Sequence, residues 1–135
     1  MTTLQFLKLY GASVVVLFAV DLVWLGVVAK DFYGRHLSTL MRPDVRWAPA
    51  VLFYLLYVAA VLVFVVQPAL ERQSLPRALL LGAFFGLTAY ATFDLTCLAL
   101  IRDFPTRVAV VDIVWGTFLT TLVSAAAYGV GRLGA

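Results

Sequence analysis

The stretch PRALLLGAFFGLTAYATFDLTCLALI, residues 76–101, decides the fold class. Its charged residues are Arg77, next to its start, and Asp94, well inside it. A helix needs about 20 mostly apolar residues to cross the hydrocarbon core of a bilayer. Backbone polar groups inside lipid must be satisfied within the segment, so a helix is the default structure there. This stretch therefore predicts a transmembrane helix.

The rest of the chain has the same character. Of its 135 residues, 64% are hydrophobic and 13% are charged, whereas a soluble domain has about 25% charged residues. A soluble domain of this size could not bury so much apolar surface. We therefore predict an all-α fold, a four-helix transmembrane bundle, forming a single integral membrane domain over residues 1–135. The predicted spans are about 4–29, 47–67, 76–101 and 106–131.

The connections between the spans carry further signals. Pro68 is expected to end the second span, because proline lacks a backbone N–H and disturbs a helix interior. The connection between the first and second spans has apolar residues near helical spacing with basic residues between them. This pattern predicts a short interfacial helix over about residues 31–41, with an ordinary polar loop as the alternative.

Basic residues cluster near the ends of the predicted spans, as membrane anchors do, so the net charge of +3 does not indicate nucleic-acid binding. The lipid bilayer is the expected partner. The connections 30–46 and 102–107 hold more basic residues than the opposite side, which favours a cytoplasmic position for both. The excess is small, so inverted or dual insertion stays open, as does a homodimer.

Asp21, Asp94 and Asp112 lie inside predicted spans. At a rise of 1.5 Å per residue, their depths from the nearest flanking basic residue are roughly 13 Å, 12 Å and 8 Å. Antiparallel helices place all three in the same half of the bilayer. An acidic residue at such depth costs a few kcal/mol to insert and usually faces the bundle interior or a wet cavity. We therefore predict that the three carboxylates share one pocket.

Two of these aspartates occur in nearly repeated motifs, VDLVWLG at 20–26 and VDIVWG at 111–116. In each motif a tryptophan, Trp24 or Trp115, follows the acid by three residues and so lies on the same helix face. The indole N–H can donate a hydrogen bond. The repeat is thus interpreted as two walls of one acidic pocket, each acid beside an indole.

The third and fourth spans each contain a row of residues at i+4 spacing that includes one of the acids. Small residues in such rows let membrane helices approach closely. The row in the third span is Gly82, Gly86, Tyr90 and Asp94, and the matching row in the fourth span is Asp112, Gly116, Thr120 and Ser124.

The complete predicted site includes several neighbours of the acids. The pocket residues for a ligand or proton are Asp21, Asp94, Asp112, Trp24, Trp115, Tyr90 and Thr96. The helper residues that could reach it are His36, Tyr33, Tyr54, Tyr57 and Cys97.

Four stretches together resemble a family of small bacterial membrane proteins, a domain of unknown function with four spans. The stretches are DLVWLG with AKDFY, FYLLYV with FVVQPAL, YATFDLTCLALIRDFP, and VDIVWG. Here Phe93 stands where a second tyrosine is expected, and Cys97 where an asparagine is expected. The resemblance implies a multi-pass protein of the bacterial inner membrane and only a loose association with membrane-lipid modification.

Three functions remain open from the sequence. The first is a pocket that binds or transports a proton-coupled cation or an amphipathic cationic or lipid ligand, because carboxylates in a low dielectric exchange protons for cations. The second is a lipid-modifying enzyme that uses the same acids as acid and base, or through Mg²⁺. The third is a structural bundle in which the acids only hydrogen-bond the helices together.

Overall fold

The computed structural model describes residues 2–24, 26 and 46–133. Within these ranges it is all-helical, which confirms the predicted class, and four helical stretches are long and apolar enough to cross a membrane. The predicted interfacial helix at 31–41 and the last residues of the predicted first span lie outside the described part of the chain. The elements are α1 (Thr3–Val23), α3 (Trp47–Val61), η2 (Leu62–Val66), α4 (Gln67–Glu71), α5 (Leu75–Leu100) and α6 (Thr106–Leu133).

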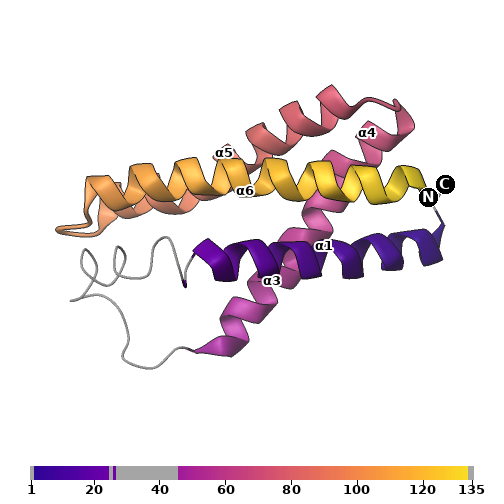
Figure 1. Cartoon of the computed structure of the whole chain (residues 1–135). Coiled ribbons are helices and arrows are strands. Elements are labelled where there is room, and N and C mark those ends of the chain that lie inside the picture. Colours follow the sequence, from indigo (N-terminus) through magenta and orange to yellow (C-terminus); the bar gives the residue numbers. More distant parts are fainter. Residues whose placement is uncertain (1, 25, 27–45, 134–135) are drawn as a thin grey trace.

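The bundle consists of helices α1, α5 and α6 and of one oblique rod formed by α3, η2 and α4. Helices α1 and α6 lie side by side and antiparallel, with the two chain termini at the same end (Figure 1). The continuous rod of α3, η2 and α4 crosses them obliquely. Helix α5 runs back along α6, and the two diverge toward the end at which α5 begins. At that end Ala69, Ala78 and Tyr128 form a small buried cluster that joins α4, α5 and α6.

The second rod does not end at Pro68, as we predicted, but continues to Glu71. The reason lies in the preceding turn. Residues Leu62–Val66 are π-helical, and the Gln67 N–H bonds to the Leu62 carbonyl five residues back. A proline ring would clash with the carbonyl of the residue four positions before it, and the wider turn relieves this conflict. Proline thus disturbs the hydrogen-bond ladder here without stopping the helix.

The two predicted i+4 rows of α5 and α6 face each other, and each residue of one row lies opposite one residue of the other. A Cβ built on Gly86 would lie 2.6 Å from the Thr120 Oγ1, and one built on Gly116 would lie 2.1 Å from the Tyr90 Cγ. A Cβ on Gly82 would similarly meet Ser124, at 2.7 Å from its Oγ. Each glycine therefore makes room for the residue opposite it, and the same register carries Asp94 toward Asp112.

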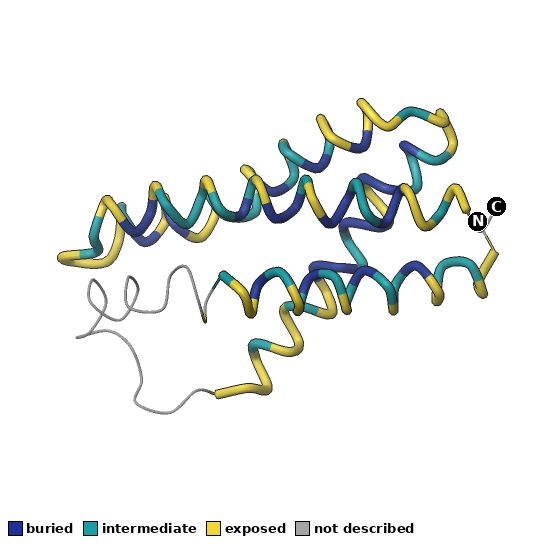
Figure 2. Tube along the Cα trace, viewed as in Figure 1, coloured by how far each residue is buried: buried dark blue, intermediate teal, exposed yellow. Residues whose placement is uncertain are grey.

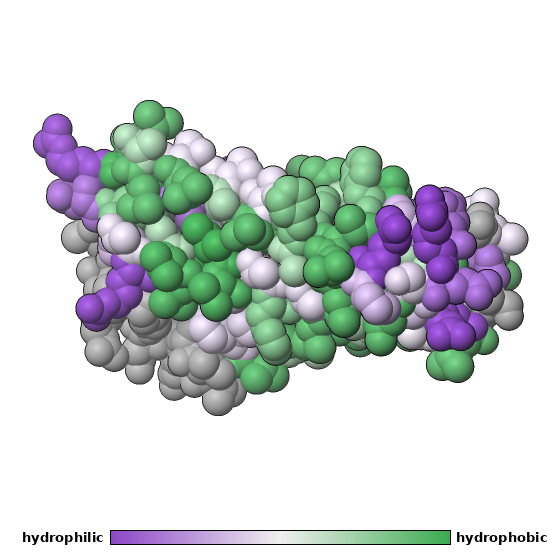
Figure 3. Space-filling view, turned by 90° about the horizontal axis from the view of Figure 1, so that it is seen from above, coloured by the Kyte–Doolittle hydropathy of each residue, from purple (hydrophilic) through white to green (hydrophobic). Residues whose placement is uncertain are grey.

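The outer surface of the bundle is apolar. Buried residues follow the inner faces of the helices, as Figure 2 shows, while large apolar side chains such as Leu80, Phe84 and Leu56 are exposed. Hydrophobic side chains cover the middle of the molecule, and hydrophilic ones gather at its two ends (Figure 3). This distribution matches a bundle whose sides contact lipid and whose ends reach the membrane interfaces.

The close approach of α5 and α6 gives a direct test. The substitution Gly116→Ala should lower the free energy of unfolding by about 1–3 kcal/mol, because the methyl group overlaps the Tyr90 ring. Gly129→Ala is the matched control on the same helix, since a Cβ there meets nothing within 4 Å. Denaturant unfolding in detergent micelles measures both. Equal stability of the two variants would contradict the close contact between Gly116 of α6 and Tyr90 of α5.

Candidate functional site

Asp21, at the end of α1, is held by donors from two other helices. The Tyr54 hydroxyl from α3 donates to the Asp21 Oδ2 at 2.5 Å, and the Trp115 Nε1 from α6 donates to the Asp21 Oδ1 at 3.2 Å. The residue is 8% exposed. Hydrogen bonds to a charged group are stronger than neutral ones. The Asp21 carboxyl therefore ties three helices together and has a donor on each oxygen.

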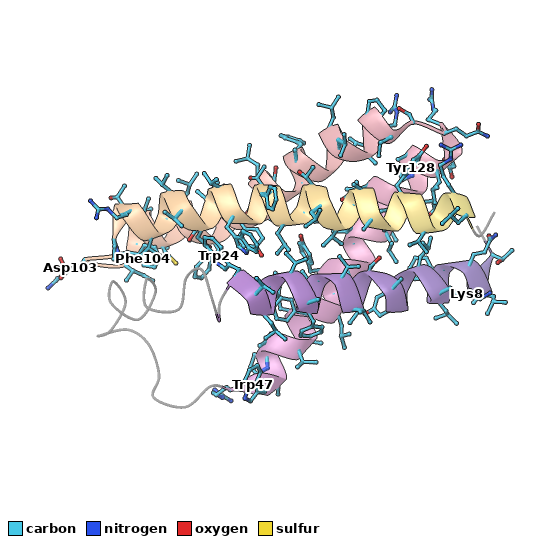
Figure 4. All side chains as sticks on the ribbon, in the orientation of Figure 1. Lys8, Trp24, Trp47, Asp103, Phe104 and Tyr128 are labelled. Carbon is cyan, nitrogen blue, oxygen red and sulfur yellow. The ribbon has the colours of Figure 1, made fainter. Side chains whose placement is uncertain are left out.

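The two tryptophans of the repeated motifs stack on each other. Their ring centroids lie 4.3 Å apart with an interplanar angle of 8°. Figure 4 shows Trp24 between the end of α1 and the ribbon of α6. We predicted that each indole would serve the acid of its own motif. Trp115 instead donates to Asp21 of the other motif, because the antiparallel helices bring the two motifs face to face.

Asp94, on α5, has a different environment. It is fully buried, and neither of its oxygens has a hydrogen-bond partner by geometry among the described residues. The neighbouring acid is Asp112 of α6, whose side chain interacts directly with it. Two carboxylates held together in a low dielectric repel each other, so the pair is stabilised by one proton or by one cation.

Two tyrosines lie near both Asp21 and Asp112. Tyr90, whose ring lies on Gly116, interacts electrostatically with both Asp21 and Asp112. Tyr54 likewise interacts with Asp112 in addition to its bond to Asp21. Asp21 and Asp112 thus lie near the same tyrosines, and Asp94 lies beside Asp112.

A second hydroxyl bond continues the cluster toward the middle of the bundle. The Thr120 hydroxyl donates to the Gly116 carbonyl at 2.7 Å, so Tyr57 must be the donor in its own hydrogen bond to Thr120. Thr120 is fully buried. The sequence analysis placed Thr120 in the i+4 row that begins at Asp112 but did not include it in the site; its membership of that row was the available signal.

Several predicted site residues take other positions. Thr96 is exposed on the outer face of α5, away from the acids. Cys97 is buried and interacts with Asp94. His36 and Tyr33 lie outside the described residues. Within residues 2–24, 26 and 46–133, no group of three or more His, Cys, Asp and Glu side chains is arranged to hold a metal ion.

The comparison with known families agrees with the helical architecture. A family described as "Predicted membrane protein (DUF2177)", a domain of unknown function, matches residues 6–129. The chain belongs to this family. The match confirms the resemblance seen in the sequence; it covers the second and third membrane-length helices fully and the first and fourth except for a few end residues. Comparison with curated proteins and with solved structures gives no match.

The hydrogen bonds of Asp21 can be tested by comparing two backgrounds. Tyr54→Phe should lower the free energy of unfolding by about 1–3 kcal/mol, because it leaves a buried carboxylate oxygen without its donor. In an Asp21→Leu background the same change should cost much less. Denaturant unfolding in micelles gives the coupling energy of this double-mutant cycle.

Tyr10→Phe is the matched control for this cycle. Its hydroxyl donates to the Leu55 carbonyl at 2.8 Å and has no bond to Asp21. Its cost should therefore be the same in both backgrounds. If Tyr54→Phe lowers the free energy of unfolding equally with and without Asp21, the hydrogen bond from Tyr54 to Asp21 is contradicted.

Proposed function

We propose that this multi-pass membrane protein binds, and carries across the bacterial inner membrane, a cation that exchanges with a proton at the Asp94–Asp112 pair. The cation is either inorganic or the charged group of an amphiphile. The observation that carries the proposal is that Asp94 is fully buried beside a second acid, and that among the described residues no hydrogen bond of normal geometry reaches either of its oxygens. Such a pair binds one positive charge, and a proton and a cation compete for it.

The contrast with Asp21 supports this assignment. Asp21 has two donors from neighbouring helices, which is how a structural acid is satisfied. If Asp94 were structural as well, the same kind of partners would be expected around it. An acid inside a span without such partners is expensive to maintain, and that expense is typical of a functional residue.

A series of buried hydroxyls supports transport rather than storage of the cation or proton. Thr120, Ser124 and Tyr128 follow one another at four-residue spacing along α6, about 6 Å per step, away from the acids. The Ser124 and Tyr128 hydroxyls are buried and have no hydrogen-bond partner among the described residues, as is also true of Ser13 on α1. These polar groups continue from the acid pair toward the opposite end of the bundle.

Proton release measures the exchange directly. Tetraphenylphosphonium, and in a parallel titration Na⁺, is added to the purified protein in weakly buffered detergent solution. We expect the wild type to release about one proton per chain with one of the two probes, since one positive charge replaces another at the pair. Asp94→Asn and Asp112→Asn should each abolish the release, because the remaining single carboxyl has lost its acidic neighbour.

Asp103→Asn is the matched control for these substitutions. Asp103 is exposed in the turn between α5 and α6, and its positive φ of 61° is a conformation that asparagine also adopts. This variant should release protons as the wild type does. Infrared spectroscopy of the protonated carboxyl band follows the pair without any probe. A band and a proton release that are unchanged in Asp94→Asn would overturn the proposal.

A further inference from the structure

A second polar site lies at the end of the bundle opposite the acids. An open cavity of about 530 Å³ is lined by the beginning of α1, by α4 with the turn after it, and by the end of α6. Arg132 in its wall is 20 residues along α6 from Asp112, which corresponds to about 30 Å. The cavity is therefore separate from the aspartate cluster. Its volume is within the ~300–1,000 Å³ that small-molecule sites typically have.

Charges of both signs line this cavity. Lys8 from α1 and Arg132 from α6 supply two positive charges, and Glu71 from α4 supplies one negative charge. Among the described residues, none of the three forms an ion pair with another. The Gln67 and Gln73 amides add neutral donors and acceptors, and apolar side chains form the rest of the wall. This lining fits a small ligand that carries both a negative and a positive group.

Two features fix the shape of this cavity. Gly131 lets α6 pass close to α4, because a Cβ there would lie 2.7 Å from the Leu70 Cδ1. The Arg132 guanidinium lies 5.9 Å from the centre of the Tyr128 ring, in a cation–π contact. The cavity wall is therefore built from packed helix ends.

The position of the cavity relative to the bilayer identifies the kind of ligand. It lies where three membrane-length helical stretches begin or end, at the level expected for lipid headgroups. Figure 4 places Lys8 and Tyr128 at this end, opposite Asp103. Leu4, exposed at the cavity, and Leu7 beside it offer an apolar surface along which acyl chains can lie.

We propose that this cavity binds the headgroup of a phospholipid that carries a primary amine, such as phosphatidylethanolamine. Lys8 and Arg132 contact the phosphodiester, and Glu71 accepts hydrogen bonds from the ammonium group. A purely anionic headgroup would leave Glu71 facing a negative charge, whereas the zwitterion complements all three side chains. The acyl chains extend along the apolar sides of the helices. This site does not depend on the proton exchange proposed for Asp94 and Asp112.

Competition between two lipids tests the proposal. The full chain in detergent is given equal amounts of phosphatidylethanolamine and phosphatidylglycerol with identical acyl chains, and native mass spectrometry counts the lipids retained. We expect about a fivefold preference for phosphatidylethanolamine, the size of effect that one partly exposed ion pair gives. Equal retention, or a preference for phosphatidylglycerol, would overturn the proposal and leave Lys8 and Arg132 as interfacial anchors only.

Three variants locate the binding. Glu71→Gln should remove the preference between the two lipids while both are still retained. The double substitution Lys8→Gln and Arg132→Gln should reduce the retention of both. Arg77→Gln is the matched control, because Arg77 is an exposed cation at the same end that does not line the cavity.

The proposal for the lipid site and the proposal for the acid pair can be tested independently of each other. Glu71→Gln should release protons as the wild type does, since Glu71 is remote from the acid pair. A preference that persists in Glu71→Gln, or that disappears in Arg77→Gln, would place the lipid elsewhere on the protein.

Discussion

The close contact between α5 and α6 is the constraint on which the rest of the structure depends. Gly86 and Gly116 allow the two backbones to approach until a single added Cβ would overlap the opposite helix. Without a hydrophobic driving force between helices in lipid, such tight contact is a main source of their association. The same register that sets glycine against threonine and tyrosine also sets Asp94 against Asp112. Assembly of the bundle and assembly of the acid pair are therefore one event: the helices cannot pack in this way without bringing the two carboxyls together.

The polar groups inside the bundle divide into satisfied and unsatisfied ones, and the division follows the helices. Asp21 is bonded by Tyr54 and Trp115, so α1 is fastened to α3 and α6 through a carboxyl with a donor on each oxygen. The stacked indoles of Trp24 and Trp115 cover the same region. Asp94 lies beside Asp112, and in the described part of the chain no hydrogen bond of normal geometry reaches its oxygens. The bonded acid fastens the helices together, whereas the position of Asp94 depends on the packing of α5 against α6.

The sequence predicted the helices well and their mutual contacts only in part. Long apolar runs predict spans because lipid leaves a backbone few alternatives, and i+4 rows of small and polar residues predicted the facing surfaces of α5 and α6. The pairing of Trp115 with Asp21 was not predictable, since spacing along one helix points to the acid of the same motif. The sequence analysis also missed the continuation of the helix through Pro68, because it depends on a π turn that the residue pattern around Leu62–Val66 does not predict. Thr96 was predicted to line the pocket because it is close to Asp94 in the chain, but its side chain is exposed. Closeness in the chain does not determine which face of the helix a residue lies on.

The oblique rod explains how one short chain holds two sites at opposite ends. Its buried residues include one row at four-residue spacing, Tyr57, Val61, Val65 and Ala69, beside a second row, Val58, Leu62 and Val66. On a regular α-helix such a row drifts around the axis, which forces neighbouring helices to cross at an angle. The π turn at Leu62–Val66 has more residues per turn, so there a row at four-residue spacing drifts in the opposite sense and offsets the drift of the α-helical parts. The rod can therefore offer tyrosines to the aspartates at its beginning and still offer Leu70 and Glu71 to the opposite cavity at its end.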